Sequence, residues 1–185
     1  MIIAFIGADG SGKTTIADHV LWRLYERGGQ VKYRHHYDGL VYKQVAKFTK
    51  KKDKKVIIKP TLVKKLWLYV MYPIFLLRWV SDKFEQGIVV RDRYAYDSLI
   101  GWTLQGRTNV ISRWLLTYLP KPDHIFLVDA LPQTLMKRKP QDYLNLGQCR
   151  EKREAYLSLA MRRSIPIVSS ERSIEKSVKD VMEAI

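Results

Sequence analysis

The chain has 185 residues, a length that suits one domain with a substantial core and is short for two. It carries 33 Lys and Arg against 18 Asp and Glu, and the net charge of +15 favours anionic partners such as nucleotides, nucleic acid or acidic lipid without choosing among them. A hydrophobic fraction of 46% is that of an ordinary globular protein. The single cysteine, Cys149, excludes an internal disulfide and fits a reducing cytosol, so we expect a cytoplasmic protein.

Short apolar runs rich in β-branched residues alternate along the chain with longer stretches of helical periodicity. We predict strands at residues 2–6, 31–34, 88–90, 124–128 and 165–169. We predict helices at residues 14–27, 62–84, 96–104, 110–119, 132–138, 146–163 and 173–184, the second of them kinked or broken near Pro73. Alternation of this kind implies right-handed crossovers. We therefore expect a single α/β domain over residues 1–185, with a parallel five-stranded sheet covered by helices on both faces.

The stretch 66–80 is the strongest candidate for a membrane span. Its apolar run is shorter than the roughly 20 residues that a bilayer needs, and Pro73 and Arg78 interrupt it. A largely buried helix of an α/β domain explains it better, and we expect no membrane contact. Residues 1–6 are also too few for the apolar core of a signal peptide, so we expect no targeting segment there.

Residues 43–65 form a basic stretch, with ten lysines and Asp53 as its only acid. Such a run is typical of a solvated segment, and a surface that faces an anion or a nucleic acid is the alternative. Proteins that bind single strands interleave stacking aromatics with their basic residues, and this stretch lacks that arrangement. A nucleic-acid-binding module is therefore the less favoured interpretation.

A glycine-rich loop follows the first predicted strand and precedes the first predicted helix. It matches the phosphate-binding pattern G-x-x-x-x-G-K-[ST] at every fixed position, with Gly7, Ala8, Asp9, Gly10, Ser11, Gly12, Lys13 and Thr14. The glycines let backbone N–H groups converge on phosphate oxygens, and the helix adds its positive end. Lys13 is expected to bridge the β- and γ-phosphates of ATP, the Thr14 hydroxyl to hold Mg²⁺, and Thr15 to complete the ATP-binding set. The sequence predicts a P-loop NTPase.

Asp9 stands inside this anion-binding loop, where a negative charge partly cancels the attraction for phosphate. One interpretation is that its carboxylate serves a second ligand. The alternative is a residue that shapes the turn, because Asp readily hydrogen-bonds to its own backbone.

Four segments in order carry a resemblance to thymidylate kinases, a family of P-loop nucleoside-monophosphate kinases. Residues 5–15 resemble the opening of these enzymes, and residues 89–94 end in their Asp-Arg-Tyr. Residues 121–129 are similar to their fourth strand, and residues 154–160 to the helix after their lid. The resemblance implies a P-loop fold with a short lid, Mg-ATP as donor, and transfer to a nucleoside monophosphate, with dTMP the leading candidate. It also implies nucleotide substrates and a homodimer.

The same resemblance assigns roles around the phosphate loop. Asp9 is similar to the carboxylate that meets the sugar and phosphate end of the acceptor, and Asp92 resembles the acid near Mg²⁺. Arg93 would hold the acceptor phosphate and the transferring group, and Tyr94 would line the acceptor pocket. For Asp92 a structural ion pair with Arg91 or Arg93 is the alternative.

The resemblance also implies a cation from the lid. Some members carry an arginine where this chain has Gly10, and members with a small residue there use the lid instead. We expect the lid at about 137–146 and take Arg138 as the first choice for the catalytic cation, with Arg150 and Arg153 as alternatives. Lys13, Arg93, Arg138 and Asp9 thus form the expected catalytic set.

The acceptor half departs from the family pattern. Of the usual Arg-Glu-Pro-Gly after the second strand only Arg34 matches, and Trp102 with Thr103 stands where the base-contacting Ala-Tyr-Gln would fall. Tyr72 occupies a helix face that should present an arginine. We expect Arg34, Tyr72, Tyr94 and Trp102 to line a less selective acceptor pocket. A P-loop kinase acting on another nucleotide, a nucleoside or a phosphorylated small molecule is the alternative.

Overall fold

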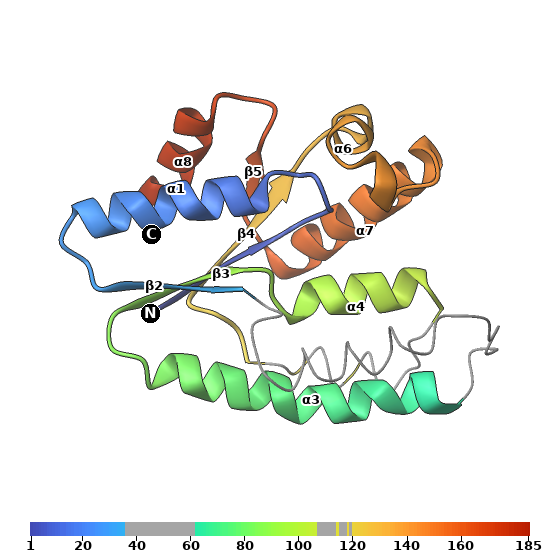
Figure 1. Ribbon diagram of the computed structural model, residues 1–185, viewed down its shortest axis with the longest axis horizontal. Coiled ribbons are helices and arrows are strands. Elements are labelled where there is room, and N and C mark those ends of the chain that lie inside the picture. Colours follow the sequence, from blue (N-terminus) through green and yellow to red (C-terminus); the bar gives the residue numbers. More distant parts are fainter. Residues whose placement is uncertain (36–61, 107–113, 115–117, 119) are drawn as a thin grey trace.

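A five-stranded parallel sheet organises the protein (Figure 1). The computed structural model describes residues 1–35, 62–106, 114, 118 and 120–185, and the backbone alone for 62–71. The strands are β1 Ile2–Ile6, β2 Val31–His35, β3 Ile88–Asp92, β4 His124–Asp129 and β5 Ile167–Ser169, in the order β2-β3-β1-β4-β5. The predicted parallel α/β fold is therefore confirmed, with β2, β3 and β4 extending beyond the expected ends and β5 beginning two residues later than expected.

Helices cover both faces of the sheet (Figure 1). They are α1 Lys13–Glu26, α3 Leu62–Lys83, α4 Ala95–Leu104, α6 Pro132–Arg138, α7 Leu146–Arg163 and α8 Ile174–Glu183, with a short 3-10 helix, η1, at Pro140–Asp142. The predicted helix at 110–119 falls mostly outside the described residues, as does most of the basic stretch 43–65. Within the part of the chain that the structure describes, no helix is long and apolar enough to cross a membrane.

The alternation of β1 side chains divides the core into two layers. Ala4 and Ile6 pack into a cluster with α3, α4, α6 and α7, whereas Ile3 and Phe5 pack with α1 and α8. All five β1 residues are fully buried, as expected for a central parallel strand with helices on both sides. Burial on both faces holds β1 in the interior of the sheet, so the loop that follows it leaves the sheet at a defined position.

The carboxyl ends of the strands meet at one edge of the sheet. Phe5 near the end of β1 pairs with Asp92 at the end of β3, so the phosphate loop and Asp92 are neighbours although they are far apart in sequence. Ligands of open α/β sheets bind at this edge, between strands whose connections run in opposite directions. The fold therefore places the site between β1 and β3.

Helix α3 runs without interruption from Leu62 to Lys83, with Pro73 in its interior. Of the expected kink or break near that proline, the structure therefore excludes the break. Proline removes one helical hydrogen bond and crowds the preceding turn, but buried Phe75 and partly buried Tyr72, Ile74 and Leu76 pack against the core around it. Apolar burial on that scale offsets the loss of one backbone hydrogen bond.

Candidate nucleotide-binding site

The loop after β1 has the backbone of a phosphate cradle. Gly7, Gly10 and Gly12 all have positive φ, at 148°, 86° and 90°. A Cβ on Gly7 would lie 2.4 Å from the Val128 carbonyl oxygen of β4, so only glycine fits there. Gly12 is the N-cap of α1, whose first turn starts at Lys13. The positive end of α1 therefore meets the loop, as in the sites where a helix N-terminus binds phosphate.

Lys13 is held inside this loop. Its side chain donates hydrogen bonds to the carbonyl oxygens of Gly7 and Ala8, both at 2.7 Å, and the residue is only 4% exposed. Burial lowers the pKa of Lys13 to about 8, against the opposing negative charge of Asp97. The ammonium group therefore lies where we expect phosphate to bind, and the two loop carbonyls are its hydrogen-bond partners in this structure.

Thr14 and Asp92, the two residues expected near Mg²⁺, are in direct contact. The Thr14 hydroxyl donates to the Asp92 carboxylate at 2.6 Å, and the Tyr33 hydroxyl donates to the same oxygen at 3.2 Å. The other carboxylate oxygen of Asp92 is buried and has no hydrogen-bond partner among the described residues. A hydroxyl beside a carboxylate with an unsatisfied oxygen fits Mg²⁺, which prefers oxygen ligands and keeps several waters.

The alternative ion pairs of Asp92 with its neighbouring arginines are not the ones observed. Arg91 pairs with the buried Asp82 of α3, and Arg93 pairs with Asp9. No group of three or more His, Cys, Asp or Glu within the described ranges could hold a metal by itself. A magnesium ion at Thr14 and Asp92 would therefore complete its shell with water and nucleotide oxygens.

Asp9 lies between two cations. Arg93 donates to one carboxylate oxygen, and Lys152 of α7 donates to the other at 2.5 Å. Burial raises the pKa of Asp9, but the charges and hydrogen bonds of Arg93 and Lys152 outweigh it and hold this pKa below its usual range. Asp9 is therefore ionised and fixed by side chains, which goes beyond a role in shaping the turn. The sequence analysis did not single out Lys152, because only the fold brings α7 to the loop.

The backbone of Arg93 is strained. Its φ is +89°, a conformation that non-glycine residues rarely adopt, and its N–H donates to the Phe5 carbonyl at 2.9 Å. Such strain persists where the surrounding structure fixes it, often at functional sites. The turn directs the Arg93 side chain from the end of β3 toward the phosphate loop.

Asp97 is a further site residue that the sequence analysis missed. This carboxylate, 6% exposed, accepts hydrogen bonds from the Gly7 N–H at 3.2 Å, the Tyr94 N–H at 2.9 Å and the Tyr156 hydroxyl at 2.8 Å. Burial raises the pKa of Asp97, while Lys13 and Arg93 oppose that shift. An acid in the first turn of a helix was a signal for a cap at α4. The link to Gly7 had no signal in the sequence.

Arg138 ends α6 and lies against the outer side of the phosphate loop. Its guanidinium donates to the Gly10 carbonyl at 3.2 Å and to the Ser170 hydroxyl at 3.1 Å. It borders a cavity of about 250 Å³ that Gly12, Thr15 and Ser170 also line. Since the cavity adjoins the first turn of α1, Arg138 stands on the side of the expected ATP. Of the alternatives, Arg153 forms a two-pronged ion pair with Asp129, and Arg150 is exposed.

Four residues expected at the acceptor do not join this group. Arg34 pairs with Asp82 and Glu85, which ties β2 to the end of α3. The Tyr94 hydroxyl donates to the Pro120 carbonyl, and the residue is buried. Tyr72 and Trp102 pack against the core, and the Trp102 ring lies 6.4 Å from that of Phe75. In this structure their side chains hold elements together.

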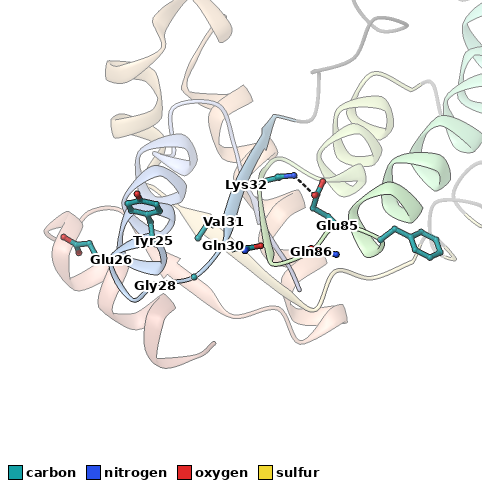
Figure 2. A pocket seen from close by; sticks show the side chains of 10 residues that line it. Tyr25, Glu26, Gly28, Gln30, Val31, Lys32, Glu85 and Gln86 are labelled. Atoms are coloured by element: carbon teal, nitrogen blue, oxygen red, sulfur yellow. Dashed lines mark hydrogen bonds and ion pairs between the residues drawn. The ribbon is translucent and has the colours of Figure 1, made fainter.

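A hollow of about 1000 Å³ lies at the opposite edge of the sheet (Figure 2). Gln30, Val31 and Gln86 line it next to the amino ends of β2 and β3, and an ion pair between Lys32 and Glu85 crosses one side of it. Because the phosphate loop follows the carboxyl end of β1, this hollow is separate from the nucleotide site.

Comparison with known proteins agrees with this geometry. The sequence pattern of thymidylate kinase matches residues 5–181. The chain belongs to the thymidylate kinase family. A probable thymidylate kinase of Sulfolobus acidocaldarius is 30% identical over 205 residues, covering 100% of this chain and 95% of its own. One of Sulfurisphaera tokodaii is 26% identical over 193 residues, with coverages of 99% and 94%.

The fold agrees as well. A thymidylate kinase from Ehrlichia chaffeensis has a TM-score of 0.70 and 20% sequence identity, covering 100% of this chain and 97% of that one. The predicted resemblance to thymidylate kinases, the P-loop fold and the class of nucleoside-monophosphate kinase are therefore confirmed. As a member of the family the protein is an enzyme that phosphorylates nucleotides.

Proposed function

We propose that this protein transfers the γ-phosphate of ATP to dTMP. The observation that carries the proposal is the joining of two half-sites at one loop. We assign Lys13 and Thr14, which contacts Asp92, to the ATP side, and the paired Asp9 and Arg93 to the acceptor side. A P-loop adenosine triphosphatase needs only the first half. The second half, a carboxylate fixed by a cation, is what an acceptor with a hydroxyl and a phosphate requires.

The residues of the chain act by position and charge, because phosphoryl transfer needs little covalent chemistry from the protein. Lys13 would leave the loop carbonyls and contact the β- and γ-phosphates, and the N–H groups of the loop would bind the same oxygens. Arg93 would hold the acceptor phosphate in line with the γ-phosphate and neutralise charge as it spreads in the transition state. Asp9 would accept a hydrogen bond from the acceptor sugar.

Magnesium would be held by the Thr14 hydroxyl and, through water, by Asp92, and when bound it would neutralise charge on the β- and γ-phosphates. The buried, unpartnered oxygen of Asp92 supports this assignment. Arg138 would contribute from the ATP side, over the cavity that adjoins Thr15.

A comparison of acceptors tests the proposal. We expect kcat/KM at fixed Mg-ATP to be highest for dTMP, with dUMP accepted at a measurable rate, because Trp102 and Thr103 cannot reproduce the hydrogen bonds of a Tyr-Gln pair. One lost hydrogen bond to a base costs about 1 kcal/mol, or several-fold in discrimination. UMP, dCMP, dGMP and thymidine complete the series. Turnover of thymidine alone, or of no monophosphate, would instead favour a P-loop kinase with another acceptor.

We also propose that the enzyme is a cytoplasmic homodimer. The buried, unpaired Cys149 is consistent with a reducing compartment. Leu77 and Phe84, 69% and 84% exposed, present apolar side chains seven residues apart at the end of α3, with Val80 between them. Such a stripe suits a contact between two copies. Light scattering would measure the mass in solution, and Leu77→Glu should convert a dimer to a monomer.

A further inference from the structure

Lys152 is a cation of the site to which neither the sequence pattern nor the family resemblance gave a role. It lies in the second turn of α7, and its ammonium group is 2.5 Å from one carboxylate oxygen of Asp9. Its side chain is 22% exposed, which is low for a lysine. Arg93 occupies the other oxygen of the same carboxylate. The Asp9 carboxylate is therefore bound from two sides, by the residue that follows β3 and by α7.

Tyr143 strengthens this arrangement. Its hydroxyl donates to the backbone carbonyl of Asp9 at 2.6 Å, and the Lys152 ammonium lies 5.4 Å from the centre of its ring. Tyr143 follows η1 directly and is only 7% exposed. The segment from η1 to α7 thus contacts Asp9 at its backbone and at its side chain. Partners that are held in place in this way lose less side-chain entropy when the ion pair forms.

We infer that Lys152 is a positioning residue for the acceptor, acting through the Asp9 carboxylate and linking the helix after the lid to the acceptor half of the site. The inference rests on the proposed function. With Lys152 in place, the Asp9 carboxylate is held in one orientation, and only one of its oxygens accepts a hydrogen bond from Arg93. Without Lys152, the carboxylate is free to turn and to take both oxygens to the Arg93 guanidinium, which favours two-pronged pairing. Arg93 would then be less available to the acceptor phosphate.

A double-mutant cycle on Asp9 and Lys152 tests this inference. Lys152→Met should lower kcat/KM for the acceptor by roughly 10- to 100-fold, as expected for the loss of one charge-assisted contact. The KM for ATP should change by less than about threefold, because Lys13 and the loop N–H groups are untouched. Lys152→Arg should restore most of the activity, since a cation can still reach Asp9. Adding Lys152→Met to Asp9→Asn should cause almost no further loss.

Lys179→Met on α8 is the control, because Lys179 is exposed and pairs only with Glu183 of its own helix among the described residues. Thermal melting of each variant shows whether it folds. Unchanged acceptor kinetics in Lys152→Met, or independent and additive losses in the double variant, would overturn the positioning role. A wild-type enzyme inactive toward every monophosphate would overturn the proposed function itself. The dTMP dissociation constant, measured by calorimetry without ATP, should also rise in Lys152→Met, and an unchanged value would contradict the inference.

Discussion

The ammonium group of Lys13 is nearly buried, and we expect the KM for ATP to depend on pH as a result. Its pKa of about 8 lies below the ordinary value for lysine, so Lys13 is charged below about pH 8 and increasingly neutral above it. ATP phosphates bind the charged form. We therefore expect the KM for ATP to rise above pH 8, approaching tenfold per pH unit at its steepest. The KM for dTMP serves as an internal control, since the guanidinium of Arg93 stays charged. A flat KM for ATP from pH 7 to 9.5 would contradict the assignment.

The Asp97 carboxylate accepts hydrogen bonds from Gly7, Tyr94 and Tyr156. A near-isosteric change at this position should show how much they contribute to stability and ATP use. Asp97→Asn keeps the shape but turns an N–H₂ group toward donors, leaving at least one of them unpaired at a cost of about 1–3 kcal/mol. We expect the free energy of unfolding in urea to fall by that amount and kcat/KM for ATP to fall as well, because Gly7 loses its anchor. Tyr156→Phe should have a smaller effect. Asp142→Asn, at an exposed position, is the control, and equal stability of Asp97→Asn and this control would refute the role.

Arg138 contacts the loop on the side where we expect ATP, so its loss should mainly weaken ATP binding. We expect Arg138→Ala to raise the KM for ATP by roughly 3- to 30-fold, the loss of one charged hydrogen-bonding group. The KM for dTMP should stay nearly constant. Steady-state kinetics with both substrates varied would separate the two. A large fall in kcat with an unchanged KM for ATP would instead support the expectation of a catalytic cation directed at the transferring phosphate.

At the scale of elements, local patterns predicted most of the fold. The strand and helix periods located every described strand and α-helix to within a few residues, because apolar burial repeats with the geometry of each. We expected a kink or break near Pro73 because the local cost of proline is visible in the sequence, whereas the packing that keeps α3 unbroken there is not. The ion pairs of Arg34 could not be predicted for a similar reason. Its partners Asp82 and Glu85 lie about fifty residues further along the chain, and no local signal announces them.

The end of α3 is joined to the sheet by a buried ion pair, and breaking it should be costly. Asp82, 1% exposed, binds Arg91 of β3 and also Arg34 of β2. Asp82→Asn leaves the buried Arg91 without its counter-ion, and we expect a loss of about 3–5 kcal/mol in the free energy of unfolding. The exposed pair of Asp180 with Arg172 gives a matched control. Asp180→Asn should cost less than about 1 kcal/mol, and similar urea midpoints for the two variants would show that the buried pair contributes little.

For the whole molecule, the sequence indicated the segment of the expected donor half but not the contacts around the expected acceptor half. The phosphate loop is one continuous segment between a strand and a helix, so its residues and their roles can be read from order alone. The acceptor side is assembled from the ends of β3 and α7 with one loop residue, Asp9. Lys152 contacts Asp9, and Asp97 contacts Gly7 of the phosphate loop, through contacts between distant segments. Those contacts depend on how helices pack over the sheet, which periodicity does not specify.

The contacts of helix α7 limit where chimeras between such enzymes can be joined. Within two turns it carries Lys152 to Asp9, Arg153 to Asp129 and Tyr156 to Asp97. The segment before it, residues 139–145, contributes few contacts of this kind beyond Tyr143. A chimera that replaces only that segment and keeps Tyr143 should fold and bind nucleotide. A junction placed inside α7 would separate partners that must be transplanted together, so the transferable module is residues 139–145 with the whole of α7 and the three acids that the helix meets.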